Sequence, residues 1–83
     1  MTHQRSKDVW ERILALLDEK LQYGLLEQAR AVMSVSLEGN ELILTVSTRE
    51  AEEFFSAHIN QQRIIILARP VLSLDKISVR IAE

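Results

Sequence analysis

The stretch VSLEGNELILTVSTREAEEFF, from Val35 to Phe55, decides the fold of this chain. Two runs of alternating apolar and polar residues flank Gly39-Asn40. This pair suits the two-residue loop of a β-hairpin, because both residues tolerate a positive φ. The run before the pair predicts a strand over Met33–Leu37, and the run after it predicts a second strand over Leu42–Val46.

A helix is expected directly after the hairpin. Ser47 and Glu50 have the spacing of a capping box, in which the hydroxyl serves the amide of the third helical residue and the carboxylate reaches back. Apolar residues then recur at helical spacing through Phe54, Phe55 and Ile59. The hairpin and the helix follow each other without an irregular segment that could form a pocket.

The segment Ile64–Leu67 is ambiguous, because its β-branched residues favour a strand by propensity. We assign it to the helix, since a single helical row accommodates Ile59, Gln62, Ile66 and Arg69. Pro70 then provides the stop.

The regions on either side of this centre complete the topology. Ser6 is the expected N-cap of a first helix whose apolar stripe contains Trp10, Ile13, Leu14, Leu17 and Leu21, and residues 1–7 are expected to form a flexible tail. Gly24 is the expected break before a second helix over Leu25–Ala31. Alternation over Ile77–Ile81 predicts the last strand. The order α-α-β-β-α-β indicates an α+β, two-layer sandwich over residues 8–83, with a three-stranded sheet covered by helices on one face.

Composition excludes several classes of protein. The chain has no cysteine, so a disulfide scaffold and a cysteine zinc site are ruled out, and a reducing cytoplasm suits it. The 10 basic residues are interleaved with 12 acidic ones, which disfavours direct nucleic-acid binding. The N-terminus lacks the apolar core of a signal peptide, and the longest apolar run, 64–68, is too short to cross a bilayer.

No constellation of residues suggests catalysis. His3 and His58 lie apart in the sequence, and no zinc or nucleophile motif accompanies them. The two glycines, Gly24 and Gly39, belong to separate elements, so no phosphate-binding loop is present. We therefore expect no enzymatic activity, no metal and no cofactor.

Two features have both a structural and a functional interpretation. Trp10 is either a core residue at the edge of the first helix or a partly exposed aromatic anchor for a partner. The carboxylates of Glu50, Glu52 and Glu53 either complement the dipole of a helix N-terminus or contribute to a partner-binding surface.

Three stretches together resemble a known family: VWERILALLDEKL (9–21), VSLEGNELILTV (35–46) and STREAEEFF (47–55). From about Val9 to Ala82 the chain is similar to the N-terminal domain, domain I, of the bacterial chromosomal replication initiator DnaA. The resemblance implies a KH-like fold without enzymatic activity. It also implies a cytoplasmic module that self-associates weakly at the origin and docks the replicative helicase or a regulator of initiation.

The resemblance also assigns roles to residues. Trp10 matches the family's self-association aromatic. The partner-binding surface would contain Leu25, Leu26, Glu50, Glu53 and Phe54. Three of these positions depart from the family. Leu25 stands where one branch has a helicase-contacting acidic residue, and Leu26 stands where an aromatic is usual. Glu50 stands where the family has an exposed Phe, so an apolar contact residue is replaced by a charged one.

Two alternatives remain open. The stretch HINQQRI (58–64) and the Trp-led helix also resemble the C-terminal domain of the gamma/tau subunit of the DNA polymerase III clamp loader, which binds the polymerase subunit. A KH-like sheet could instead bind a single-stranded nucleic acid, although the acidic pI and the few aromatic residues disfavour it.

Overall fold

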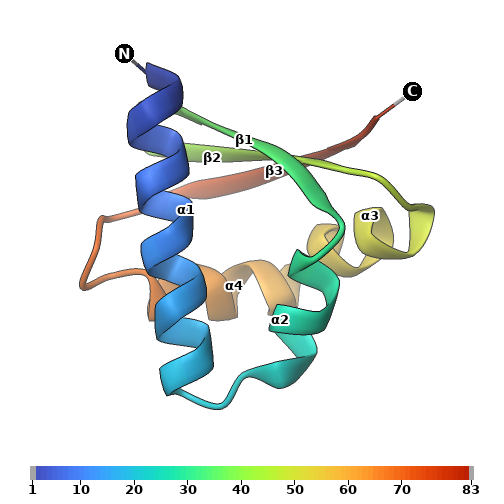
Figure 1. Ribbon diagram of the computed structural model, residues 1–83, viewed down its shortest axis with the longest axis horizontal. Helices are drawn as coiled ribbons and strands as arrows, with labels where there is room; N and C mark the ends of the chain where they lie inside the picture. Colours follow the sequence, from blue (N-terminus) through green and yellow to red (C-terminus); the bar gives the residue numbers. More distant parts are fainter. Residues whose placement is uncertain (1, 83) are drawn as a thin grey trace.

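The computed structural model describes the backbone of residues 2–82 and the side chains of residues 6–82. Four helices and three strands follow one another in the order α-α-β-β-α-α-β, so the two-layer α+β class is confirmed with one helix more than expected. Figure 1 shows the elements α1 (Thr2–Glu19), α2 (Tyr23–Ala29), β1 (Val32–Glu38), β2 (Glu41–Val46), α3 (Arg49–Ser56), α4 (His58–Leu67) and β3 (Lys76–Ile81).

The sheet has the order β1-β2-β3, with β2 in the centre. β1 runs antiparallel to β2, and β3 runs parallel to it, because α3 and α4 return the chain before β3 begins. Glu38 pairs with Glu41 across the hairpin, which confirms the two-residue loop. Gly39 has a φ of 60°, in the left-handed region that glycine tolerates best.

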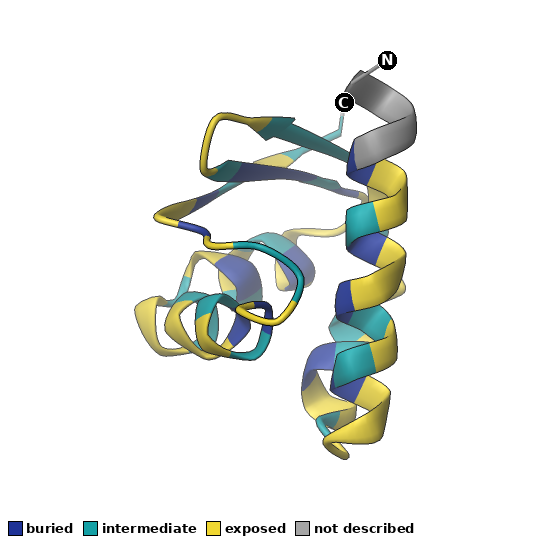
Figure 2. Ribbon diagram, turned by 90° about the vertical axis from the view of Figure 1, so that its left-hand side faces the viewer, coloured by how far each residue is buried: buried dark blue, intermediate teal, exposed yellow. Residues whose placement is uncertain are grey.

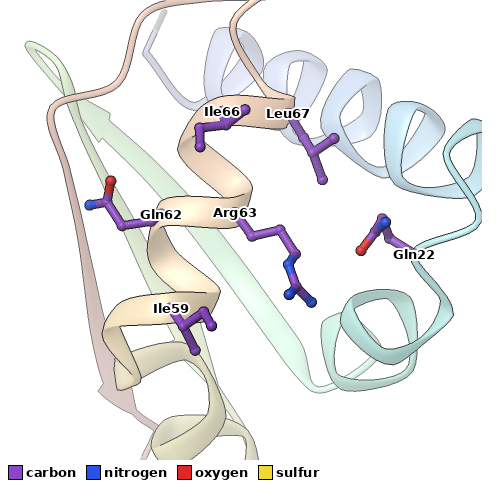
Figure 3. A pocket seen from close by; sticks show the side chains of 6 residues that line it. All are labelled: Gln22, Ile59, Gln62, Arg63, Ile66 and Leu67. Carbon is purple, nitrogen blue, oxygen red and sulfur yellow. The ribbon is translucent and has the colours of Figure 1, made fainter.

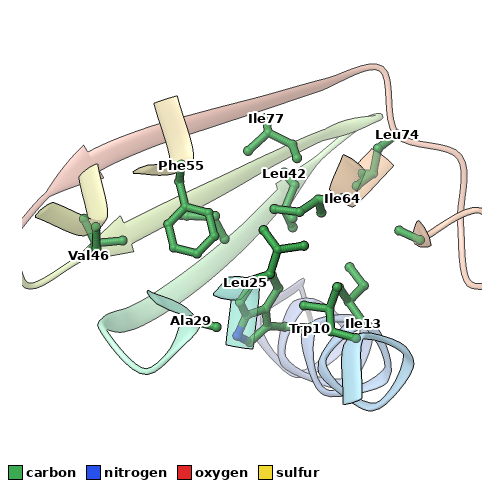
Figure 4. Close-up of a cluster of buried hydrophobic side chains, with 14 residues drawn as sticks. Trp10, Ile13, Leu25, Ala29, Leu42, Val46, Phe55, Ile64, Leu74 and Ile77 are labelled. Atoms are coloured by element: carbon green, nitrogen blue, oxygen red, sulfur yellow. The ribbon is translucent and has the colours of Figure 1, made fainter. Parts of the chain in front are cut away.

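One face of the sheet forms the core with the helices. Leu42, Leu44 and Val46 of β2 are fully buried there, opposite apolar side chains from every helix (Figure 4). The helical contributions to this core are Trp10, Ile13, Leu17, Leu25, Ala29, Ala51, Phe55 and Ile64. By register, the opposite face of the sheet carries mainly polar residues, among them Ser34, Ser36, Thr45 and Ser78.

A register shift between Val32 and Ser34 interrupts the alternation of β1. Met33 was expected on the apolar face with Val35 and Leu37, but it is largely exposed. A bulge leaves one residue without a ladder partner, and the side chain of that residue is free to leave the core face.

α1 begins at Thr2, so the predicted start at Ser6 is wrong, and residues 2–7 belong to the helix instead of a tail. Ser6 lies one turn before Trp10 on the buried row of the helix, where its small side chain is almost completely covered. In Figure 2 the buried positions of α1 lie on the side that faces the rest of the molecule.

α1 ends in a Schellman motif instead of at Gly24. The N–H of Gln22 donates to the carbonyl of Leu17 at 2.8 Å and that of Leu21 to Asp18 at 3.1 Å, while Leu21 has a φ of 58°. The predicted break and the predicted range Leu25–Ala31 are both wrong, because α2 spans Tyr23–Ala29 and includes Gly24.

The expected single helix after the hairpin is divided at Ala57, whose ψ of 128° is extended. Two side chains of α4 donate hydrogen bonds to carbonyls near the end of α3. Asn60 Nδ2 donates to the Phe54 oxygen at 2.9 Å, and Gln61 Nε2 donates to the Phe55 oxygen at 2.8 Å. The helical assignment of Ile64–Leu67 is confirmed, since all four residues lie in α4.

Candidate protein-interaction surface

The N-terminus of α3 places the predicted acidic residues. Thr48, not Ser47, is the N-cap, and its hydroxyl accepts a hydrogen bond from the N–H of Ala51 at 3.1 Å. The predicted capping box of Ser47 and Glu50 is therefore wrong. Glu50 lies in the first turn of the helix, where a carboxylate complements the positive end of the helix dipole.

The outward side of α3 combines acidic and aromatic residues. Ala51 and Phe55 enter the core, whereas Glu50 and Glu53 are exposed. Phe54 is half-buried, and its ring meets that of Phe55 edge to face, with centroids 5.3 Å apart. A partly open aromatic side chain on a helix that also exposes carboxylates offers a partner an apolar contact point beside charged ones. We call Glu50, Glu53 and Phe54 the α3 surface.

α2, which contacts α3, contributes less than expected. Leu25 is only 2% exposed and belongs to the core, so its side chain is not available to a partner in the folded chain. Leu26 is half-buried and packs against the core with part of its surface open. Of the five predicted partner-binding residues, the structure thus exposes or partly exposes four.

Trp10 belongs to α1, and its indole lies near Leu25 and Ala29 of α2 in the core (Figure 4). It is 7% exposed and packs in the core, which favours its structural interpretation. Its remaining surface borders a groove of about 460 Å³, whose apolar lining includes Leu14 and Met33 and whose polar lining includes Lys7 and Glu11. The α1–β1 groove is the place at which a partner could reach the indole.

A second groove, of about 310 Å³, was not expected from the sequence. Six residues line it: Gln22, Ile59, Gln62, Arg63, Ile66 and Leu67. Figure 3 shows Arg63 extending from α4 across the groove toward Gln22. The signal for it was the helical row of Ile59 and Ile66, which suggested a helix but did not reveal which way the row would face.

No cluster of three potential metal ligands occurs within the described part of the chain. His58 is exposed at the start of α4, and the side chain of His3 lies outside the described residues. Within residues 2–82, none of the helices combines the length and apolar character needed to cross a bilayer.

Comparison with protein-family models, with curated proteins and with solved structures found no match for this chain.

Proposed function

We propose that this chain is a non-enzymatic protein-interaction module of the bacterial replication machinery. In this proposal it acts as domain I of the initiator DnaA does, by docking the replicative helicase or a regulator of initiation and by associating weakly with itself. The observation that carries the proposal is the α3 surface, where the exposed Glu50 and Glu53 and the partly open ring of Phe54 lie on one helix that contacts α2.

The arrangement of elements supports the same proposal. A first helix bearing Trp10 packs beside a hairpin, and a third strand returns parallel to β2, so the first helix, the hairpin and the last strand follow the order that the resemblance implies. The outward sides of α2 and α3 remain available, because their buried residues point into the core.

The burial of Trp10 changes which residues a second copy of the chain would contact in the expected self-association. Since the indole is mostly covered, a second copy would contact the rim of the α1–β1 groove more than the ring itself. Met33 is the most exposed apolar side chain of that rim. Its substitution by serine therefore tests self-association without opening a cavity in the core.

The clamp-loader alternative loses part of its support. The stretch HINQQRI was one reason to consider it, but Asn60 and Gln61 in this stretch already have a structural role, as they bond the last carbonyls of α3. Their presence does not need a polymerase partner as an explanation.

Capture by the immobilised chain separates the candidate partners. Purified replicative helicase, purified polymerase subunit and a labelled single-stranded oligonucleotide are offered in parallel, and the helicase is the expected ligand. Retention of the polymerase subunit alone would favour the clamp-loader alternative. Retention of the oligonucleotide alone would favour a nucleic-acid function.

A further inference from the structure

The surface of α4 exposes apolar residues that the core does not use. Ile59 is 66% exposed and Ile66 is 52% exposed, and they lie seven residues apart, so two helical turns separate them on one side of α4. Together with Leu67 they form the apolar part of the groove in Figure 3, which we call the α4 groove.

The charge of this surface has one sign. Arg63 follows Ile59 by four residues and precedes Ile66 by three, so its guanidinium stands between the two isoleucines. No acidic residue occurs from His58 to Leu74, although acidic residues outnumber basic ones in the chain, 12 to 10. Among the described residues, Arg63 forms neither an ion pair nor a side-chain hydrogen bond.

The turn that faces α4 adds an unusual residue. Gln22 borders the groove, and its neighbour Leu21 is a largely exposed leucine in the left-handed region, where glycine is the usual residue. Tyr23, on the other side of Gln22, is also largely exposed. Exposed apolar side chains thus cluster along the chain at this turn as well as on α4.

We propose that the α4 groove docks an amphipathic helix of a partner protein, and that a carboxylate of this helix pairs with Arg63. Apolar side chains spaced three, four or seven residues apart would match Ile59 and Ile66, as in other helix-in-groove contacts. The carboxylate would use the planar donors of the guanidinium, which suit bidentate pairing. The α4 groove is distinct from the α3 surface, and this inference does not depend on the proposed function.

Synthetic helices provide the probe. The acidic peptide, of about 15 residues, carries leucines at helical spacing and glutamates beside them, and the basic peptide has lysine at each glutamate position. Each is titrated into the 15N-labelled chain while amide chemical shifts are recorded. The acidic peptide is expected to shift the amides of residues 59–67 and of Gln22, and the basic peptide to bind at least about tenfold more weakly.

Variants test the role of the guanidinium. Arg63→Gln is expected to weaken binding of the acidic peptide about tenfold, the size of a lost charge-assisted contact. Arg69→Gln removes the same charge from an exposed position just beyond α4 and is expected to leave the affinity within about twofold. Equal far-ultraviolet circular dichroism of both variants excludes unfolding as the cause.

Four results would overturn the assignment. Three concern the peptides: shifts confined to residues outside the α4 groove, equal affinity for the acidic and basic peptides, and no shift at millimolar peptide. The fourth is a concentration-dependent shift of residues 59–67 in the chain alone, because a second copy would then be the occupant.

Discussion

At the scale of single residues, Thr48 determines where α3 begins. Its hydroxyl accepts the hydrogen bond of the Ala51 N–H, which would otherwise have no partner at the helix start. Thr48→Ala is expected to lower the free energy of unfolding by about 1 kcal/mol. Urea denaturation followed by circular dichroism measures it. Ser47→Ala is the matched control, with an expected change below about 0.5 kcal/mol, and a larger loss for Ser47→Ala would contradict the assignment.

The sequence could not distinguish these two hydroxyl residues, since both are good N-caps. The choice depends on a contact distant in sequence. The N–H of Ser47 donates to the carbonyl of Ala31 at 2.8 Å, so Ser47 is still held beside the residue that precedes β1. The helix therefore starts one residue later than the local pattern predicts. Glu50 is then an acidic residue of the first turn and not the partner in a capping box.

Leu21 provides a second residue-scale prediction. A leucine in the left-handed region destabilises the folded state by about 1–2 kcal/mol. Leu21 is largely exposed, so burial of its side chain offsets little of this strain. Leu21→Gly is expected to raise the free energy of unfolding by about 0.5–1 kcal/mol, because glycine adopts this conformation without strain.

Glu19→Gly is the comparison for Leu21→Gly, because Glu19 is the last residue of α1 and has a right-handed conformation. This substitution is expected to lower stability by up to about 1 kcal/mol. Equal losses in both variants, by urea denaturation, would show that Leu21 is not strained.

At the scale of elements, local pattern was sufficient for the hairpin. Gly39 occupies the one loop position with a positive φ, and the alternation of Leu42, Leu44 and Val46 matches the buried face of β2. The helical state of Ile64–Leu67 was also predictable, because the spacing of Ile59 and Ile66 outweighed the β propensity of three consecutive isoleucines.

The division between α3 and α4 was not predictable from periodicity. Apolar residues continue across Ala57, and neither glycine nor proline marks the break. The break depends on side-chain bonds formed across the joint, from Asn60 and Gln61 to the carbonyls of Phe54 and Phe55. Such bonds exist only once the two helices have been placed at an angle by the core.

These two amides give a prediction for the joint. Asn60→Ala and Gln61→Ala are each expected to lower the free energy of unfolding by about 0.5–1.5 kcal/mol, since each removes a part-buried side-chain hydrogen bond to a carbonyl near the end of α3. Gln62→Ala, at an exposed neighbour with no such bond, is expected to change it by less than about 0.5 kcal/mol. Thermal or urea unfolding measures all three. Equal effects at the three positions would show that the amide bonds do not hold the joint.

At the scale of the whole molecule, burial separates the residues that maintain the fold from those that could meet a partner. The resemblance to the initiator domain made both Leu25 and Leu26 partner-binding candidates, and the apolar residues of a short helix do not show which of the two faces the core. Packing against the core distinguishes the two residues, since Leu25 is buried and Leu26 is only half-buried. The same packing turned Ile59 and Ile66 outward and produced a groove that no local pattern indicated.

Trp10 shows the consequence for mutational tests. Removing a buried aromatic side chain costs about 3–5 kcal/mol, and the total stability of a domain this small is of similar size. Trp10→Ala is therefore expected to unfold much of the chain, as urea denaturation would show, and loss of self-association in it would be uninformative. A stable, folded Trp10→Ala chain would contradict the core assignment.

Met33→Ser is expected to reduce self-association in sedimentation velocity while the chain keeps its stability.

In the proposed function, the α3 surface docks a replication protein. Isothermal titration with purified replicative helicase tests this docking when the chain and two charge-reversed variants are compared. We expect saturable binding by the chain, at least about tenfold weaker binding by the Glu50→Lys, Glu53→Lys double variant, and unchanged binding by Glu38→Lys, whose exposed carboxylate lies at the hairpin. Absence of binding by the chain, or equal affinity for all three, would contradict it.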